Sequence, residues 1–188
     1  MTFTELAFAC VLHLVNGAPS EGKCDNAFFR EVASSVQVEA KRFKVDKELI
    51  VGVMRFESGF DQDAKSPRGA LGLMQVLRDG AADGDFAKMS DWMLTRVQLN
   101  IYLGVRYLAY ARRQCKPHFL TLYNQGHGCY ESGYSLGVYA AISSMKSSRI
   151  FRAVRKHLPR APETEIPVQG SFLLASQRPV AVPQRYWP

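Results

Sequence analysis

The sequence lacks the patterns that mark several large protein classes. Apolar and polar residues do not alternate over any sustained stretch, which argues against a large β-sheet. The apolar stretch at residues 6–15 is much shorter than the roughly 20 residues that span a bilayer, and no Lys or Arg precedes Lys23 as it would in a cleaved secretion signal. We therefore expect an N-terminal helix that packs on the domain or on a partner. An uncleaved export signal is the alternative.

Cysteine is scarce, and its spacing argues against a zinc site. The four cysteines, Cys10, Cys24, Cys115 and Cys129, form no C-x-x-C motif. Their even number permits two disulfides in an oxidising compartment, whereas free buried thiols are the other interpretation. We expect neither a metal nor a cofactor.

Length and charge set further limits. A chain of 188 residues with 47% apolar composition suits one domain with a real core. The net charge of +7 suits a polyanionic partner, which could be nucleic acid, a membrane surface or the bacterial cell wall. The sequence has no recognisable DNA-reading helix or aromatic platform, so nucleic acid is not the expected partner.

The spacing of apolar residues predicts a mainly α-helical domain. Val97, Ile101, Val105 and Leu108, for example, recur every three or four positions, as on one face of a helix. Polar residues that favour helix starts precede two of the segments, at 25 or 26 and at 46. The predicted helices cover residues 25–44, 47–57, 91–114, 117–123 and 134–145.

The character of the chain changes near its C-terminus. Six of the nine prolines lie at positions 159, 162, 167, 179, 183 and 188, where few residues can continue a helix. We expect residues 1–24 to form an apolar N-terminal segment, residues 25–158 the domain, and residues 159–188 an extended tail. The tail is interpreted as a strap over a protein partner, with packing on its own domain as the alternative.

One carboxylate stands in a position that suits catalysis. Glu57 falls at the C-terminal end of an apolar helix, where the helix dipole and partial burial both raise the pKa of a carboxyl group. A protonated glutamate can act as a general acid. Asp61 and Asp63 follow closely, but both are expected to be solvated loop residues. The next glycine-rich stretch, which ends in Gln75, can form tight turns beside Glu57.

Several separated segments match the motifs of one family in the family's order. They are Glu57-Ser58; Ala64, Ser66, Gly69, Ala70, Gly72, Leu73, Met74 and Gln75 of an A-x-S-x-x-G-A-x-G-L-M-Q pattern; Asn100, Ile101, Gly104, Tyr107 and Leu108; Leu122-Tyr123-Asn124; and Gly133-Tyr134 with Val138. Through residues 45–145 the chain thus resembles the bacterial and phage lytic transglycosylases with a soluble-transglycosylase (SLT, goose-lysozyme-like) domain.

The resemblance implies a lysozyme-like α+β fold and a specific reaction. Such enzymes cleave the peptidoglycan bond between N-acetylmuramic acid and N-acetylglucosamine and leave a 1,6-anhydro product. Glu57 would act first as acid and then as base. The sugar subsites would be lined by Ser58, Met74, Gln75, Tyr123, Asn124 and Tyr134, whereas Asn100, Gly104 and Tyr107 would support the fold. For Met74, a position in the core is an equally good interpretation.

The resemblance also bears on the biological setting. Domains of this kind occur in phage particles, where they open the host wall for genome delivery, and among periplasmic helpers of secretion systems. We predict a phage virion component that acts in the host periplasm, with the bacterial periplasmic helper as the alternative. A structural virion assembly protein with secondary lytic activity is a third possibility.

Overall fold

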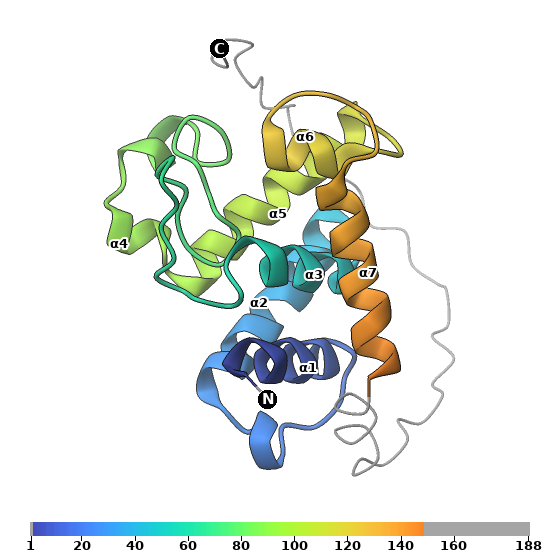
Figure 1. The fold of residues 1–188 in the computed structure, drawn as a ribbon. Helices are drawn as coiled ribbons and strands as arrows, with labels where there is room; N and C mark the ends of the chain where they lie inside the picture. The colour runs from blue at the N-terminus through green and yellow to red at the C-terminus, as the bar shows by residue number, and fades with distance from the viewer. Residues whose placement is uncertain (1, 149–188) are drawn as a thin grey trace, which may run out of the picture.

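The computed structural model describes residues 2–148, which fold around seven α-helices (Figure 1). Short 3₁₀ turns at Gly22–Cys24 and Gly84–Lys88 interrupt the connecting segments. The prediction of a mainly helical domain is confirmed. The helices are α1 (Phe3–Val15), α2 (Ala27–Phe43), α3 (Lys47–Glu57), α4 (Asp91–Leu94), α5 (Val97–Gln114), α6 (Phe119–Gln125) and α7 (Gly133–Ser147).

The apolar N-terminal stretch is a helix that packs into the core. Thr2 and Glu5 form a reciprocal capping box, which satisfies backbone N–H groups at the start of α1. Phe8 and Leu12 are fully buried, and α1 contacts both α2 and α3. Within residues 2–148, no helix is both long and apolar enough to cross a membrane.

The starts of α2 and α3 are fixed by side-chain caps at the positions that the sequence predicts. The Asn26 side chain accepts a hydrogen bond from the backbone N–H of Phe28 at 2.9 Å. Asp46 does the same for the backbone N–H of Glu48 at 2.8 Å. Helix α3 begins directly after Asp46 and is eleven residues long, so its last residue is Glu57.

The single helix predicted over residues 91–114 is wrong, because the chain breaks after Leu94. Arg96 adopts a non-helical conformation (φ −60°, ψ 130°), and α5 begins only at Val97. The physical reason lies in Asn100, whose side-chain Nδ2 donates to the Leu94 carbonyl at 2.8 Å. That carbonyl would accept a backbone N–H in a continuous helix, so the Asn100 amide replaces the helical partner.

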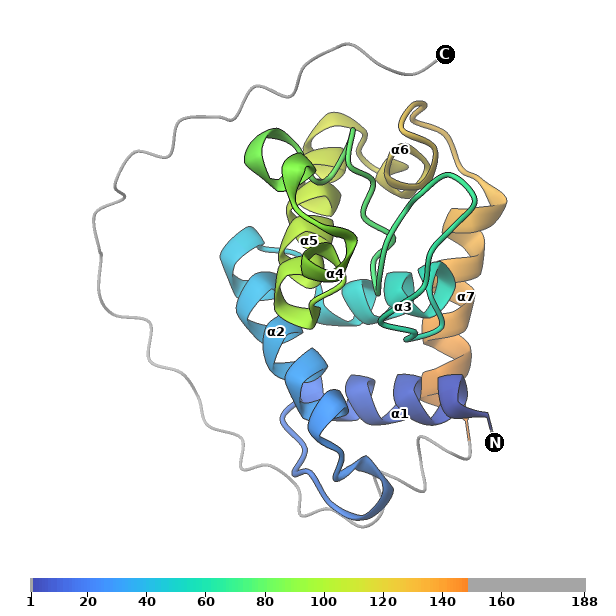
Figure 2. The same ribbon diagram turned by 90° about the vertical axis from the view of Figure 1, so that its left-hand side faces the viewer.

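The helices enclose two neighbouring groups of buried apolar side chains. The larger one lies between α1, α2, α3, α5, α6 and α7, and the smaller one lies under the loops that precede α4. Helix α5 contributes to both, and it packs along α2 on one side and α6 on the other (Figure 2). The looped segment at residues 64–90 folds over the smaller group. Besides the 3₁₀ turn at Gly84–Lys88, its regular structure consists of isolated β-bridges at Lys65–Leu71 and Leu71–Val76.

Both disulfides permitted by the cysteine count are present. Cys10 pairs with Cys24 and ties α1 to the turn before α2, and Cys115 pairs with Cys129 and ties the end of α5 to the loop after α6. No cluster of three or more potential metal ligands occurs in the described part of the chain. The predicted tail at residues 159–188 lies outside the described residues.

Candidate active site

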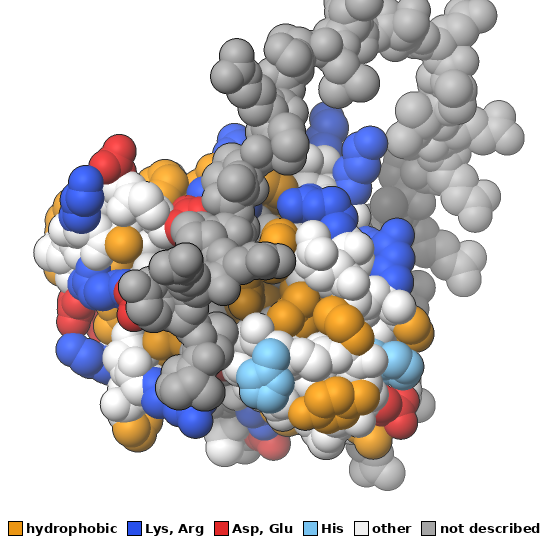
Figure 3. Space-filling model, turned by 90° about the horizontal axis from the view of Figure 1, so that it is seen from above, with side chains coloured by type: hydrophobic (Ala, Val, Ile, Leu, Met, Phe, Trp, Pro, Cys, Tyr) orange, Lys and Arg blue, Asp and Glu red, His pale blue; other side chains and the backbone are white. Residues whose placement is uncertain are grey.

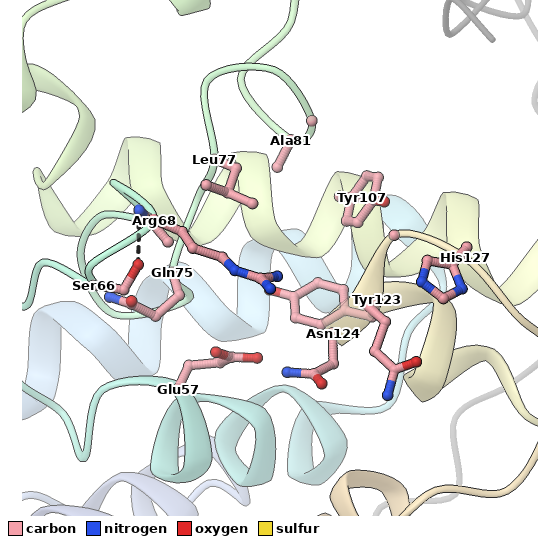
Figure 4. Close-up of a pocket in the computed structure, with 14 residues that line it drawn as sticks. Glu57, Ser66, Arg68, Gln75, Leu77, Ala81, Tyr107, Tyr123, Asn124 and His127 are labelled. Carbon is pink, nitrogen blue, oxygen red and sulfur yellow. Dashed lines mark hydrogen bonds between the residues drawn. The ribbon is translucent and has the colours of Figure 1, made fainter. Parts of the chain in front are cut away.

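A cavity of about 730 Å³ opens between the end of α3, the segment at residues 66–81, and helices α5 and α6 (Figure 4). Its walls combine one carboxylate, one guanidinium, several amides and two tyrosine rings. The lining residues are Glu57, Ser66, Arg68, Ala70, Gln75, Leu77, Gly80, Ala81, Tyr107, Tyr123, Asn124, Gln125, Gly126 and His127.

Glu57 projects into this cavity from the last turn of α3. Burial raises the pKa of its carboxyl group above the usual value, and the hydrogen bond that it accepts from Tyr134 lowers the pKa in part. The net shift is upward, so a larger fraction of Glu57 is protonated near neutral pH than for a solvated glutamate. This is the behaviour required of a general acid.

Tyr134 contacts the Glu57 carboxyl group from the protein side of the cavity. Its hydroxyl donates a hydrogen bond to Glu57 Oε1 at 2.6 Å. Burial and the nearby Glu57 raise the pKa of Tyr134 well above its ordinary value, which keeps the phenol protonated as a donor. The close packing of α3 on α7 sets this geometry, because the Phe56 ring lies over Gly137, where an added Cβ would approach the ring to 2.7 Å.

The floor of the cavity is fixed by one buried amide. The side chain of Asn100, which has no exposed surface, accepts a hydrogen bond from the Met74 backbone N–H at 2.8 Å and donates to the Leu71 carbonyl at 2.8 Å. Gly72 makes this approach possible, since an added Cβ there would lie 2.5 Å from Asn100 Nδ2. The expectation that Asn100 supports the fold is consistent with these contacts.

The contacts of Met74 and Ser58 are with other parts of the protein. The Met74 side chain is fully buried and packs on Gly104, so it does not reach the cavity surface. The Ser58 hydroxyl donates to the Leu73 carbonyl at 2.9 Å and joins the end of α3 to the Gly72–Gln75 turn. Direct substrate contact by these two side chains stays a prediction.

The side chains of Gln75 and Tyr123 are each held in place by a hydrogen bond to a backbone carbonyl. Gln75 has a positive φ of 48°, and its side-chain Nε2 donates to the Gly72 carbonyl at 3.0 Å, which commits its donor group and leaves Oε1 as an acceptor beside the cavity. The Tyr123 hydroxyl donates to the Met74 carbonyl at 2.8 Å, so its ring forms part of the wall. Asn124 is exposed at the cavity edge.

Four of the seven predicted site residues therefore line one cavity, namely Glu57, Gln75, Tyr123 and Asn124. Tyr134 contacts Glu57 from the protein side, and Ser58 and Met74 lie beneath the turn. Asp61 and Asp63 are exposed and do not line the cavity, as expected for solvated loop residues. Glu57 is the single acidic side chain in the cavity lining across residues 2–148.

Sequence reasoning missed several lining residues. Tyr107 was expected only to support the fold, yet its ring reaches the cavity, 5.7 Å from the Tyr123 ring centre. Gln125 and His127 directly follow the matched Tyr123-Asn124 pair, and this adjacency was the available signal. Arg68 occupies an unspecified position of the glycine motif, so no pattern marked it.

The loop that carries His127 is fastened to the helices on both sides. The Cys115–Cys129 disulfide ties it to α5, and the Thr121 hydroxyl of α6 donates to the Tyr130 carbonyl at 2.6 Å. Tyr130 in turn donates to Gln125 Oε1 at 2.6 Å. On the face seen from the α6 end, apolar and histidine side chains gather together, with Lys and Arg near them (Figure 3).

Residues 34–135, just over half of the chain, match the family described as the transglycosylase SLT domain. The chain belongs to this family. The matched range contains Glu57, the glycine-rich turn, α5 and α6, and it ends within the first turn of α7, one residue after Tyr134. The recognition made from the motifs is thus confirmed at the level of the SLT domain.

Several similar proteins are named as transglycosylases. The chain is 27% identical over 148 residues to the membrane-bound lytic murein transglycosylase C of Edwardsiella ictaluri (strain 93-146), which is 67% of this chain and 40% of that protein. It is 31% identical over 129 residues to the protein of that name from Actinobacillus pleuropneumoniae serotype 5b (strain L20), covering 60% of this chain and 35% of that protein.

A third relative of the same name, from Cronobacter sakazakii (strain ATCC BAA-894), is 36% identical over 80 residues, which is 39% of this chain and 22% of that protein. The chain therefore spans less than half of the length of these relatives.

Proposed function

We propose that this SLT-domain protein is a peptidoglycan lytic transglycosylase. The observation that carries the proposal is Glu57, a partly buried carboxyl group that faces a cavity of about 730 Å³ and accepts a hydrogen bond from Tyr134 at 2.6 Å. The SLT family match and the names of the relatives support the same reaction class.

In the first step, the protonated Glu57 donates its proton to the glycosidic oxygen between N-acetylmuramic acid and N-acetylglucosamine. The bond from this oxygen to C1 of the muramyl residue breaks, and positive charge develops on that sugar. Tyr134 occupies Oε1, so Oε2 is the oxygen that can face the substrate. The same hydrogen bond stabilises the carboxylate that remains after proton transfer.

In the second step, the Glu57 carboxylate accepts the proton from the C6 hydroxyl of the same muramyl residue. The C6 oxygen then bonds to C1 and forms the 1,6-anhydro ring, which regenerates protonated Glu57 without consuming water. This route requires a single residue that acts first as acid and then as base, whereas most glycoside hydrolases employ a pair of carboxylates. The lining described above, in which Glu57 has no acidic neighbour, supports the one-acid route.

The amide-rich wall suits the proposed substrate. Both sugars of peptidoglycan carry N-acetyl groups, which offer one donor and one acceptor each. The Gln75 acceptor and the exposed Asn124 amide stand on opposite sides of Glu57 (Figure 4), where they can pair with such groups. Tyr107 and Tyr123 add ring surface against which the apolar faces of sugars can pack.

We place this activity in a phage particle that opens the host wall from the periplasmic side during genome delivery. The alternative is a bacterial periplasmic protein that opens the wall for a secretion system. The two disulfides, Cys10–Cys24 and Cys115–Cys129, suit a protein that works in an oxidising compartment in either case. Copurification of the chain with virions at fixed stoichiometry supports the first setting, and its absence from virions supports the second.

Product analysis tests the proposed reaction. Purified protein incubated with peptidoglycan should release fragments that end in anhydro-muramic acid, seen by mass spectrometry as species lighter by one water than hydrolysis products. Glu57→Gln should bind glycan strands but lower the turnover by at least about 100-fold, the usual loss for a missing general acid. Reducing ends in place of anhydro ends would reassign the protein as a hydrolase.

A further inference from the structure

Arg68 stands at the mouth of the cavity on a turn that is held by three hydrogen bonds. The Gly69 backbone N–H donates to the Ser66 carbonyl at 2.9 Å, and the Ser66 N–H donates to the Ala70 carbonyl at 2.9 Å. The Ala70 N–H donates to the Ser66 hydroxyl at 3.0 Å. Gly69 has a φ of 80°, so the turn closes without strain and sets the direction in which the Arg68 side chain leaves it.

The Arg68 side chain extends from this turn across the cavity, above Glu57 and toward Tyr123 (Figure 4). Within residues 2–148 it forms neither an ion pair nor a hydrogen bond. The neighbouring arginines differ, because Arg78 is paired with Asp91 and Arg106 with Asp83, and both also donate to backbone carbonyls. The charge of Arg68 thus faces the cavity without a partner from the described protein.

The cavity does not neutralise this charge. Its one lining carboxyl group belongs to Glu57, and burial raises the pKa of that group, which favours the uncharged form. A cavity that holds an unpaired guanidinium, beside an acid whose pKa is raised, favours the binding of anions. A guanidinium also presents parallel N–H donors whose geometry matches the two oxygens of a carboxylate.

We propose that Arg68 binds a carboxylate of the substrate and thereby selects glycan strands that carry acidic groups over neutral ones. This inference rests on the proposed function, because it concerns the substrate of the same cavity. The sugar rings and their N-acetyl groups are uncharged, so the carboxylate must come from a substituent on the muramyl residue. That substituent is either a free lactyl group or the acidic residues of an attached stem peptide.

Initial rates on three matched substrates test the proposal and separate these sources. The substrates are glycan strands with intact stem peptides, strands whose peptides have been removed so that the lactyl carboxylates are free, and peptide-free strands whose lactyl carboxylates are methyl esters. Arg68→Gln removes the charge and keeps a polar side chain. Arg68→Lys keeps the charge but loses the parallel N–H donors of the guanidinium. Arg113→Gln, an exposed arginine outside the cavity, is the control for net charge.

For Arg68→Gln we expect KM to rise about tenfold on a carboxylate-bearing substrate, which corresponds to about 1.4 kcal/mol, with kcat nearly unchanged. Arg68→Lys should fall between the wild type and Arg68→Gln, whereas Arg113→Gln should match the wild type. On the methyl ester strands, all four proteins should have the same KM. A rise in KM on peptide-free strands identifies the lactyl carboxylate, and a rise confined to peptide-bearing strands identifies the peptide.

An unchanged KM for Arg68→Gln on both acidic substrates overturns the proposal. So does a lower kcat with unchanged KM, because Arg68 would then act on the chemical step and not on substrate selection. Calorimetric titration with peptide-free and peptide-bearing fragments, in the Glu57→Gln background, reads the same contact without turnover. If the wild type cleaves no substrate, the proposed function fails, while equal Kd values with and without Arg68 would separately refute this inference.

Discussion

Tyr134 and Glu57 lie 77 residues apart in the sequence, yet the Tyr134 hydroxyl lies 2.6 Å from Glu57 Oε1. The pair joins the last turn of α3 to the first turn of α7. It lowers the pKa of Glu57 against the larger upward effect of burial. The two effects together decide over which pH range Glu57 can donate a proton.

Removal of this hydroxyl should change the pH dependence of activity. In Tyr134→Phe the pKa of Glu57 loses the contribution that lowers it, so the pKa rises further. Activity that requires protonated Glu57 is lost as pH rises through this pKa, and the alkaline limb of the kcat profile should therefore move to higher pH. We also expect kcat at its optimum to fall about tenfold, because the carboxyl group loses its orienting partner.

The profile of Tyr139→Phe provides the control for this experiment. Tyr139 lies on the same helix but is exposed and does not line the cavity. Its variant should keep the wild-type profile. An alkaline limb that moves to lower pH in Tyr134→Phe would contradict the assignment of the hydroxyl as a donor to the Glu57 carboxylate.

Glu57 should lower the stability of the protein at neutral pH. Its pKa is raised in the folded state, so between the unfolded and folded pKa values the folded state binds more protons than the unfolded state. The free energy of unfolding contributed by this group is therefore highest at low pH and falls as pH rises through that window. Glu57→Gln cannot ionise, and it should have a higher Tm than the wild type at pH 7.

Thermal unfolding at a series of pH values measures this effect. The difference in Tm between Glu57→Gln and the wild type should grow from about pH 4 upward, where a normal glutamate begins to ionise. Glu131→Gln, at an exposed position outside the cavity, should leave Tm nearly unchanged over the same range. A difference that shrinks with rising pH would show that burial does not raise the pKa of Glu57.

The two disulfides should differ in their effect on the cavity. Each joins cysteines 14 residues apart, so loss of either should lower the free energy of unfolding by a similar amount, about 3 kcal/mol by loop entropy. Replacement of Cys115 and Cys129 by serine should also raise KM, because this bridge fastens the loop that contains His127. Replacement of Cys10 and Cys24, which tie α1 to the turn before α2, should leave KM unchanged.

Urea unfolding and initial rates on glycan strands measure the two effects separately. The Cys10/Cys24 variant is the matched control for stability. Equal KM values in the two double variants would show that the Cys115–Cys129 bridge does not hold the cavity wall.

Asn100 should be among the most sensitive positions for stability. Asn100→Ala would leave the Leu71 and Leu94 carbonyls and the Met74 N–H buried without their present partner, at a cost of about 3–5 kcal/mol in the free energy of unfolding. Asn124→Ala, at the exposed edge of the cavity, should change it by less than about 0.5 kcal/mol. Urea denaturation measures both, and a small loss for Asn100→Ala would mean that water replaces the amide.

Local signals predicted much of the fold. Asn26 and Asp46 cap α2 and α3 where expected, because a cap depends on residues within one helical turn. The break before α5 was missed, since it depends on Asn100, whose other partners lie 26 to 29 residues earlier in the chain. Apolar periodicity within residues 91–114 carries no information about those distant partners, which hold the Asn100 amide where it also donates to the Leu94 carbonyl.

In the candidate site, too, the sequence predicted some features and missed those that depend on distant contacts. Glu57, Gln75, Tyr123 and Asn124 were found because motif matches name them, and they converge on one cavity. Sequence matches did not distinguish side chains that face this cavity from those that support it. They left a core position and substrate contact equally open for Met74, which is buried, and they did not predict the backbone contact of Ser58. Arg68 was missed because no motif records the direction in which its side chain extends or its lack of a partner in residues 2–148.

The three hydrogen bonds of Asn100 also bear on how the protein folds. They join the turn at Leu71–Met74 to the end of α4 and the first turn of α5. The final geometry of the turn beside Glu57 therefore depends on the start of α5 at Val97. We expect the amide hydrogens of Met74 and of early α5 to exchange with solvent through the same opening event, so that the turn at Leu71–Met74 and α5 behave as one cooperative unit.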